Sequence, residues 1–333
     1  MTRRIATGAR SMRRVIILGI AAAALALSAI AAGAEDWPSR PVRIVVPFAA
    51  GGAADTFGRL YADALSSAFG QQFYVENRLG AGGLIATEGV ARAKPDGYTL
   101  IVSGIPTHVL GPAMNKNVSF DPMRDFTHIA FFGGAPNVFV VHPDFGARSL
   151  GAFMARARSE SGGIEYVSAG FGTLGNWVAE YLAATADIKL VHVAYKGGAN
   201  AVLDLIAGHV KVGMLTYSSV AEHIRAGALI PLAVTASARL AQMPEVPTFR
   251  ELGYPELVAT TWFALSGPAA MPADIVTRLN RSVVAAMERP QMRKLVEQDA
   301  VETKAMTAAE VTRYIQSEID KWQPIIARMI GSK

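Results

Sequence analysis

The sequence contains no cysteine. This absence excludes a disulfide framework, a thiolate metal site, a cysteine nucleophile and a lipid-modified cysteine behind an export signal. The six histidines stand far apart, and no two have the spacing of three or four residues that brings two ligands to one face of a helix. We therefore expect no metal site.

The motifs of common enzymes are also absent. The sequence has no G-x-S-x-G elbow of the kind found in α/β hydrolases, and its carboxylates are scattered along the chain. A secreted α/β enzyme therefore stays the weaker alternative, and we expect no catalytic residue.

Without its first 34 residues, the chain also has no excess of positive charge. The chain has 32 basic and 27 acidic residues, but residues 1–34 hold five of the arginines and no acid. The remaining chain has 27 residues of each sign and no basic run with interleaved aromatics. We therefore expect no nucleic-acid partner.

The sequence begins with an apparent export signal. Residues 1–14 are basic, residues 15–32 are apolar, and Ala32 and Ala34 place small residues before a cut. These are the three parts of a secretory signal peptide, so residues 1–34 are predicted to be removed after Ala34. A membrane anchor is the alternative, but an apolar run of about 18 residues is short for a span.

Two details of export stay open. Arg13-Arg14 permits either the general secretory or the twin-arginine route, and Met12 is a second possible start. Either way, we expect the exported protein to be a monomer in the periplasm.

Beyond the signal, short apolar runs alternate with amphipathic segments. The apolar runs predict strands buried on both faces, and the amphipathic segments predict helices. Such alternation is typical of βαβ units with a mostly parallel sheet. The expected strands are 42–47, 73–76, 98–102, 164–167, 190–193, 210–215 and 230–235. The expected helices are 55–69, 84–92, 150–158, 173–184, 200–207, 220–226, 272–287 and 308–330.

Two segments interrupt this alternation. Residues 126–141 contain two apolar runs with no helix between them, and residues 261–266 form another apolar strand after a proline-rich loop. We interpret both as crossings between two α/β lobes, with a cleft that closes by hinge motion around a small ligand. The expected limits are 35–139 with 263–333 for lobe 1 and 140–262 for lobe 2.

Three glycine-rich turns follow predicted strands and open predicted helices. They are residues 47–55 (Pro-Phe-Ala-Ala-Gly-Gly-Ala-Ala-Asp), 168–173 (Ser-Ala-Gly-Phe-Gly-Thr) and 195–198 (Tyr-Lys-Gly-Gly). Glycine lets backbone amides approach a ligand, and a helix N-terminus favours negative charge, so such turns can hold a carboxylate without a basic side chain. On its own, the first turn is better read as a plain strand–helix turn with Asp55 at the start of the helix, and Lys196 as a solvated turn residue.

A nucleotide site is the alternative for the second turn. Gly170, Gly172 and Gly175 match the G-x-G-x-x-G fingerprint of dinucleotide-binding folds. That fingerprint needs an acid at the end of the next strand, where this chain has Val-Ala-Tyr-Lys at 193–196. We therefore expect no cofactor.

Several motifs in collinear order resemble one family. They include residues 44–55, 75–83 (Val-Glu-Asn-Arg-x-Gly-Ala-Gly-Gly), 95–100 (Pro-Asp-Gly-Tyr-Thr-Leu) and 120–126. The chain resembles the periplasmic receptors of tripartite tricarboxylate transporters, also called the Bug family. The resemblance implies a type II periplasmic-binding-protein fold, with two α/β lobes joined by two crossing strands and a ligand cleft between them. It also implies capture of a small organic carboxylate and delivery to membrane permease subunits, with a membrane signalling partner as the alternative.

The turns and the resemblance together predict the ligand site. Turn amides would supply most polar contacts, because charge-assisted hydrogen bonds to a carboxylate are strong. The expected ligand-binding residues are Phe48, Ala49, Gly51, Gly52, Asp55, Thr107, Asn137, Ser168, Gly170, Gly172 and Thr173.

Three positions depart from the family pattern. Asn176 stands where a histidine is common, Leu215 where an aspartate is common, and Gly111-Pro112 where Asn-Pro is common. The missing aspartate favours a plain carboxylate over an amino acid as the ligand.

Overall fold

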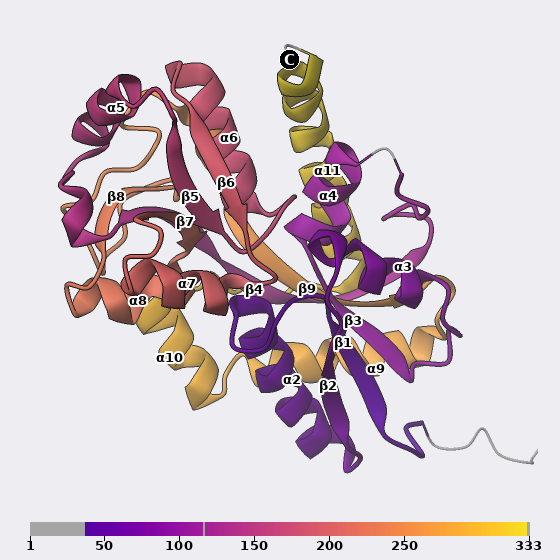
Figure 1. The fold of residues 1–333 in the computed structure, drawn as a ribbon. Coiled ribbons are helices and arrows are strands. Elements are labelled where there is room, and N and C mark those ends of the chain that lie inside the picture. The colour runs from indigo at the N-terminus through magenta and orange to yellow at the C-terminus, as the bar shows by residue number, and fades with distance from the viewer. Residues whose placement is uncertain (1–36, 116, 332–333) are drawn as a thin grey trace, which may run out of the picture. The chain divides into compact units, whose positions relative to one another are not determined.

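The computed structural model describes residues 37–115 and 117–331 (Figure 1). The predicted signal peptide at residues 1–34, with its cleavage after Ala34, lies outside these residues. Within them, no helix combines the length and the apolarity that crossing a membrane requires.

The first half of the sheet consists of two βαβ units. Strand β1 (Val42–Val46) pairs in parallel with β2 (Phe73–Asn77) and with β3 (Thr99–Gly104). Helices α2 (Ala53–Phe69) and α3 (Leu84–Ala91) connect them. In α2 the residues Phe57, Tyr61 and Leu65, spaced four apart, are buried, which is the periodicity of one helix face.

The two predicted crossings are the longest strands of the sheet. Strand β4 (Phe126–Val141) runs antiparallel to β9 (Thr260–Pro268), and β9 also pairs antiparallel with β3. From Asn137 onward β4 pairs instead with β7 and β8. The absence of a helix between residues 126 and 141 is therefore confirmed, and β4 connects both halves of the sheet. The strand order is β2-β1-β3-β9-β4-β7-β5-β6, with β8 beside β4.

The second half repeats the alternation. Strand β5 pairs in parallel with β6 and with β7. All the predicted elements of this half form, with ends shifted by a few residues. They are α5 (Leu150–Ser159), β5 (Ile164–Ser168), α6 (Leu174–Ala186), β6 (Leu190–Ala194), α7 (Gly198–Ile206), β7 (Val212–Thr216), α8 (Tyr217–Arg225) and β8 (Ile230–Val234).

The C-terminal segment contributes α9 (Ala273–Ala286), α10 (Pro290–Asp299) and α11 (Ala308–Gly331). The sequence pattern did not predict α10, a short and mostly exposed helix in which Met292 is the one buried residue among those described. It also did not predict the π-helix η2 (Pro106–Leu110) and the short α4 (Gly111–Met114). Each segment has a proline, Pro106 or Pro112, and a proline in a sequence usually indicates the end of a helix. Here each proline lies in the first turn of its segment, where its missing N–H costs no helical hydrogen bond.

The aromatic core joins the C-terminal helix to α6 and β9. Trp177 of α6 and Trp322 of α11 are fully buried, with ring centroids 4.7 Å apart at 70°. The indole N–H groups of Trp262 and Trp322 both donate to Oε2 of Glu318, at 3.0 and 3.3 Å. Trp262 of β9 is also fully buried, so all three of these tryptophans belong to the core. The exact limits of the two lobes stay a prediction.

Candidate ligand-binding site

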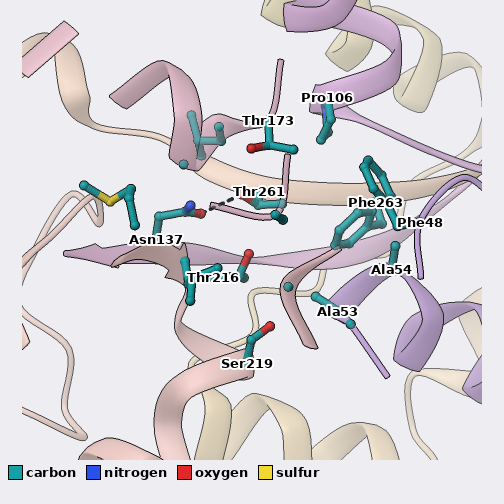
Figure 2. Close-up of a pocket in the computed structure, with 17 residues that line it drawn as sticks. Phe48, Ala53, Ala54, Pro106, Asn137, Thr173, Thr216, Ser219, Thr261 and Phe263 are labelled. Carbon is teal, nitrogen blue, oxygen red and sulfur yellow. Dashed lines mark hydrogen bonds between the residues drawn. The ribbon is translucent and has the colours of Figure 1, made fainter. Parts of the chain in front are cut away.

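A pocket lies against the crossing strands (Figure 2). It holds about 490 Å³ of space that no atom fills, counting the part open to solvent. Its 17 lining residues come from turns and helix starts that are far apart in the sequence and from strands β4, β7 and β9. They are Phe48, Gly52, Ala53, Ala54, Pro106, Asn137, Ala169, Thr173, Leu174, Gly175, Gly198, Met214, Leu215, Thr216, Ser219, Thr261 and Phe263.

The first turns of four helices line this pocket. Helix α2 contributes Ala53 and Ala54, α6 contributes Leu174 and Gly175, α7 contributes Gly198, and α8 contributes Ser219. The first amides of a helix have no partner within it and carry the positive end of its dipole. Because none of the lining residues bears a charge, an anion in this pocket would have to be held by backbone and neutral polar groups.

A hydrogen-bond donor from the crossing strands adds to these amides. The hydroxyl of Thr261 donates to Oδ1 of Asn137 at 2.6 Å, and the backbone N–H of Asn137 donates to Oγ1 of Thr235 at 2.8 Å. No described residue accepts a hydrogen bond from Nδ2 of Asn137. Since Oδ1 is occupied and the side chain lines the pocket, the Asn137 amide has N–H groups available for a ligand, and the predicted contact stays a prediction.

Apolar side chains form the rest of the wall. Phe48 and Phe263 lie together on one side (Figure 2). Leu174, Met214 and Leu215 also line the pocket. Leu215 stands where the family pattern commonly has an aspartate, so the pocket carries no negative charge that would bind an ammonium group. The site is suited to a carboxylate attached to a carbon skeleton.

Among the predicted site residues, Phe48, Gly52, Asn137 and Thr173 line the pocket. The other seven lie outside the lining set, and several of their polar groups have partners within the chain.

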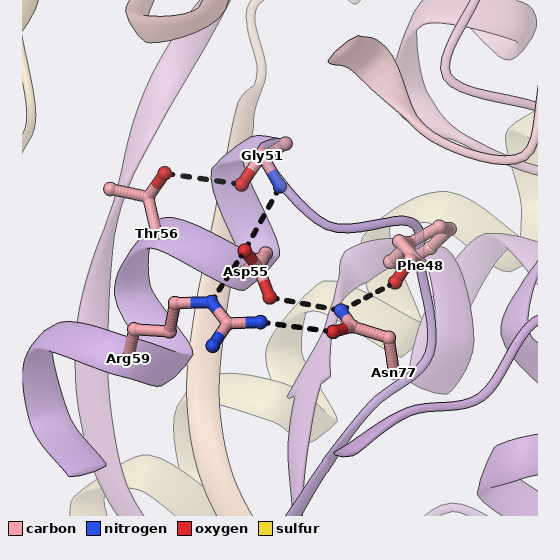
Figure 3. A network of polar contacts seen from close by, with 7 residues as sticks. Phe48, Gly51, Asp55, Thr56, Arg59 and Asn77 are labelled. Carbon is pink, nitrogen blue, oxygen red and sulfur yellow. Dashed lines mark hydrogen bonds and ion pairs between the residues drawn. The ribbon is translucent and has the colours of Figure 1, made fainter. Parts of the chain in front are cut away.

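The turn after β1 is held by Asp55 (Figure 3). Its Oδ2 accepts the backbone N–H of Gly51 and the Nε–H of Arg59, each at 2.9 Å, and its Oδ1 accepts Nδ2–H of Asn77 at 2.9 Å. Burial would raise the pKa of Asp55, but these hydrogen bonds outweigh it and hold the pKa below its ordinary value. Asp55 therefore shapes the turn, and direct contact of Gly51 or Asp55 with a ligand stays a prediction.

The turn after β5 is held in a similar way. The N–H of Gly170 donates to Oγ of Ser168 at 3.1 Å, and the N–H of Gly172 donates to Oδ1 of Asn176 at 3.1 Å. Oγ1 of Thr173 donates to the carbonyl of Gly170 at 2.7 Å and caps α6. The amides of Gly170 and Gly172 thus have partners in the chain, and the ligand contact that we predicted for them stays a prediction.

The two remaining residues are also paired. Oγ1 of Thr107 exchanges hydrogen bonds with the backbone of Gly104 at 3.3 Å and with Nδ1 of His108 at 3.0 Å. The N–H of Ala49 donates to the carbonyl of Lys196 at 2.9 Å. The predicted ligand contacts of Thr107 and Ala49 stay untested.

Segments before and after β4 meet around the pocket. The Ala49–Lys196 bond joins the first glycine turn to the third. A Cβ atom added to Gly82 would lie 2.4 Å from the carbonyl oxygen of Phe171, which places the loop after β2 directly against the second turn. Because Gly52 and Thr173 line one pocket, the first and second turns face a common space, as predicted.

The sequence analysis missed Thr216, Ser219 and Thr261. Thr216 and Ser219 follow a predicted strand, as the three glycine turns do, so the position after the strand was an available signal. Thr261 reaches the pocket only through the pairing of β4 with β9, which no local pattern reveals.

Comparison with known proteins agrees with this geometry. The family described as "Tripartite tricarboxylate transporter family receptor" matches residues 57–330. Protein BugT of Bordetella pertussis is 32% identical over 325 residues, covering 96% of this chain and 98% of that protein.

Two solved structures resemble the fold closely. The structure of R. palustris Rpa4515 with adipate has a TM-score of 0.83 and 31% identity, covering 89% of this chain and 99% of that one. MatC (Rpa3494) from Rhodopseudomonas palustris with bound malate has a TM-score of 0.83 and 29% identity, covering 87% and 100%. The predicted periplasmic-binding-protein fold is thereby confirmed. The chain belongs to the tripartite tricarboxylate transporter receptor family, which includes the Bug proteins.

Proposed function

We propose that this protein is a monomeric periplasmic receptor that binds one small organic carboxylate and delivers it to a membrane permease. The observation that carries the proposal is the uncharged pocket on which four helix N-termini and the Asn137 amide converge. The adipate and malate named for two similar structures support a carboxylate ligand.

The chemistry of the wall narrows the ligand class. Hydrogen bonds to an ionised carboxylate are about twice as strong as neutral ones, so several backbone donors suffice without a cation. A micromolar affinity corresponds to about −8 kcal/mol, which a few such bonds and an apolar wall can supply. Because no acid lines the pocket, we propose a plain mono- or dicarboxylate in preference to an amino acid.

Ligand capture requires the surrounding turns to open and close. We propose two lobes, residues 35–139 with 263–333 and residues 140–262, that separate about β4 and β9 and close over the ligand. The Ala49–Lys196 hydrogen bond and the Gly82–Phe171 contact would form in the closed protein, and the permease would recognise that form. The ligand is then released unchanged.

The test is a thermal-shift screen of residues 35–333 against dicarboxylates, aromatic acids and amino acids. A carboxylate that binds only the native protein raises the melting temperature by mass action. Calorimetry then measures its affinity, and chromatography of the recovered acid detects any turnover. A preference for amino acids would refute the plain-carboxylate assignment, and product formation would refute the receptor function.

A variant locates the site in the same screen. Gly52→Trp fills the pocket and should abolish the shift, since Gly52 lines the pocket. Gly162→Trp is the matched control, because Gly162 is exposed and a Cβ atom added there meets no atom within 4 Å. Equal shifts in both variants would place the ligand elsewhere.

A further inference from the structure

Two residues behind the pocket wall hold the turn that opens α6. Asn176 lies in the first turn of α6, and its Oδ1 accepts the N–H of Gly172 at 3.1 Å. Its Nδ2 donates to Oη of Tyr166 at 2.9 Å and lies 3.3 Å from Nδ1 of His192. On the other side of the ring, Nε2 of His192 lies 2.8 Å from Oγ of Ser168.

These contacts permit one protonation state of His192. The Gly172 N–H fixes which end of the Asn176 amide is oxygen, so the Asn176 atom facing His192 is a donor. Nδ1 of His192 must therefore accept, and the single ring proton lies on Nε2. That proton is donated to Ser168, whose own hydroxyl remains free to donate to the carbonyl of Gly170 at 3.1 Å.

Protonation of His192 disrupts this arrangement. A second ring proton on Nδ1 would face the N–H of Asn176, which sets donor against donor. The groups facing the ring are the stacked Tyr166, with centroids 4.9 Å apart, and Glu180, whose Oε1 accepts from Oη of Tyr166 at 3.1 Å. Burial lowers the pKa of His192, while the negative charge of Glu180 acts in the opposite direction.

The turn leads directly to the pocket. Ser168 and Thr173 both bind Gly170 through their hydroxyls, and Thr173 is the N-cap of α6 that lines the pocket. A shift of Ser168 would therefore displace the first turn of α6, whose Leu174 and Gly175 line the pocket.

We propose that Asn176 and a neutral His192 are positioning residues that hold the α6 N-terminus in its binding geometry, so that ligand affinity falls when His192 becomes protonated. The affinity part of this inference rests on the proposed function, whereas the effect on the turn does not.

The first experiment follows the free protein by NMR between pH 5 and 8. The ring signal of His192 reports its protonation, and hydrogen exchange of the Gly172 amide reports the turn. We expect the Gly172 amide to lose protection as His192 takes up its proton. In Asn176→Asp, a carboxylate can accept both from Gly172 and from the protonated ring, so His192 should titrate at higher pH with the amide still protected.

The second experiment measures the affinity of the strongest carboxylate among malate, adipate and benzoate at pH 7.5 and 5.5. Because the neutral form of His192 is the one that favours binding and its pKa lies below the ordinary value of about 6.5, the wild type should bind more weakly at pH 5.5, by less than about tenfold. His192→Gln should remove this dependence. His209→Gln, at an exposed histidine beside Asp204, is the control and should keep it.

The outcomes separate the two proposals. If hydrogen exchange of the Gly172 amide does not change as His192 is protonated, the positioning role is overturned. An affinity with the same pH dependence in His192→Gln would overturn the link to the pocket. If none of the three acids binds at either pH, the proposed function is contradicted for these acids and the NMR result alone decides the role of Asn176 and His192.

Discussion

The hydroxyl of Thr261 donates a 2.6 Å hydrogen bond to Oδ1 of Asn137, which joins the two crossing strands inside the pocket. Both side chains are buried, with 6% and 2% of their surface exposed. Because this bond occupies the acceptor end of Asn137, the donor end is left for the ligand. The strands that connect the two halves of the sheet thus also place a hydrogen-bond donor in the wall of the pocket.

Replacement of this donor should weaken binding strongly. Asn137→Asp keeps the acceptor for Thr261 but places a negative oxygen where a carboxylate ligand binds. We expect affinity measured by calorimetry to fall by roughly 100-fold or more, since a donor is lost and a like charge is added. The control is Asn117→Asp at an exposed asparagine. Equal affinities for both variants would remove Asn137 from the site.

A methyl group at Gly82 should oppose closure. Gly82 has φ +66°, and its added Cβ would lie 2.4 Å from the Phe171 carbonyl oxygen. Gly227 has φ +73° with no atom within 4 Å of such a Cβ, so Gly227→Ala carries only the backbone strain of about 1 kcal/mol. We expect Gly82→Ala to weaken ligand binding at least about tenfold, while Gly227→Ala lowers only the melting temperature. Similar affinities in the two variants would contradict a closed state that depends on this contact.

Acid should destabilise the fold through His128. Its ring is buried between Oγ of Ser266 at 3.0 Å and the Pro122 carbonyl at 3.1 Å, and burial lowers its pKa to about 4. The unfolded chain, with an ordinary pKa of about 6.5, then binds more protons between these values. Stability is complete above about pH 6.5 and falls by about 3 kcal/mol as the pH drops to about 4.

Urea unfolding at pH 7.5 and 4.5 measures this loss. His108 is also buried, and its pKa lies well below the ordinary value, so it contributes in the same direction. His128→Gln should reduce the difference between the two midpoints, and the exposed His209→Gln should not. An unchanged difference in His128→Gln would exclude His128 as a cause of acid sensitivity.

The first turn should depend on Asp55. Asp55→Asn replaces one acceptor oxygen by a donor opposite Gly51, Arg59 or Asn77, and we expect a loss of about 2 kcal/mol in the free energy of unfolding. Asp63→Asn in the same helix removes only an exposed pair with Arg289 and should cost less than about 1 kcal/mol. Denaturant unfolding at pH 7 compares them. Because the pKa of Asp55 is lowered, its contribution is present at neutral pH and is lost as the pH falls below about 4.

Local patterns in the sequence predicted the elements of the fold and the family. Helix and strand periodicities are local properties, so most elements followed from spacing alone, and motifs in collinear order identified the family. The position of the glycine turns beside the pocket also followed from local patterns. Each turn joins the end of a predicted strand to the start of a predicted helix.

Only the tertiary structure decided which groups face the ligand. The amides of Gly51, Gly170 and Gly172, predicted as donors, are bonded to Asp55, Ser168 and Asn176. Thr261 meets Asn137 through the register of two strands more than 100 residues apart in the chain. A donor is available only if no other group of the folded chain accepts from it, and that depends on long-range packing which residue spacing does not encode.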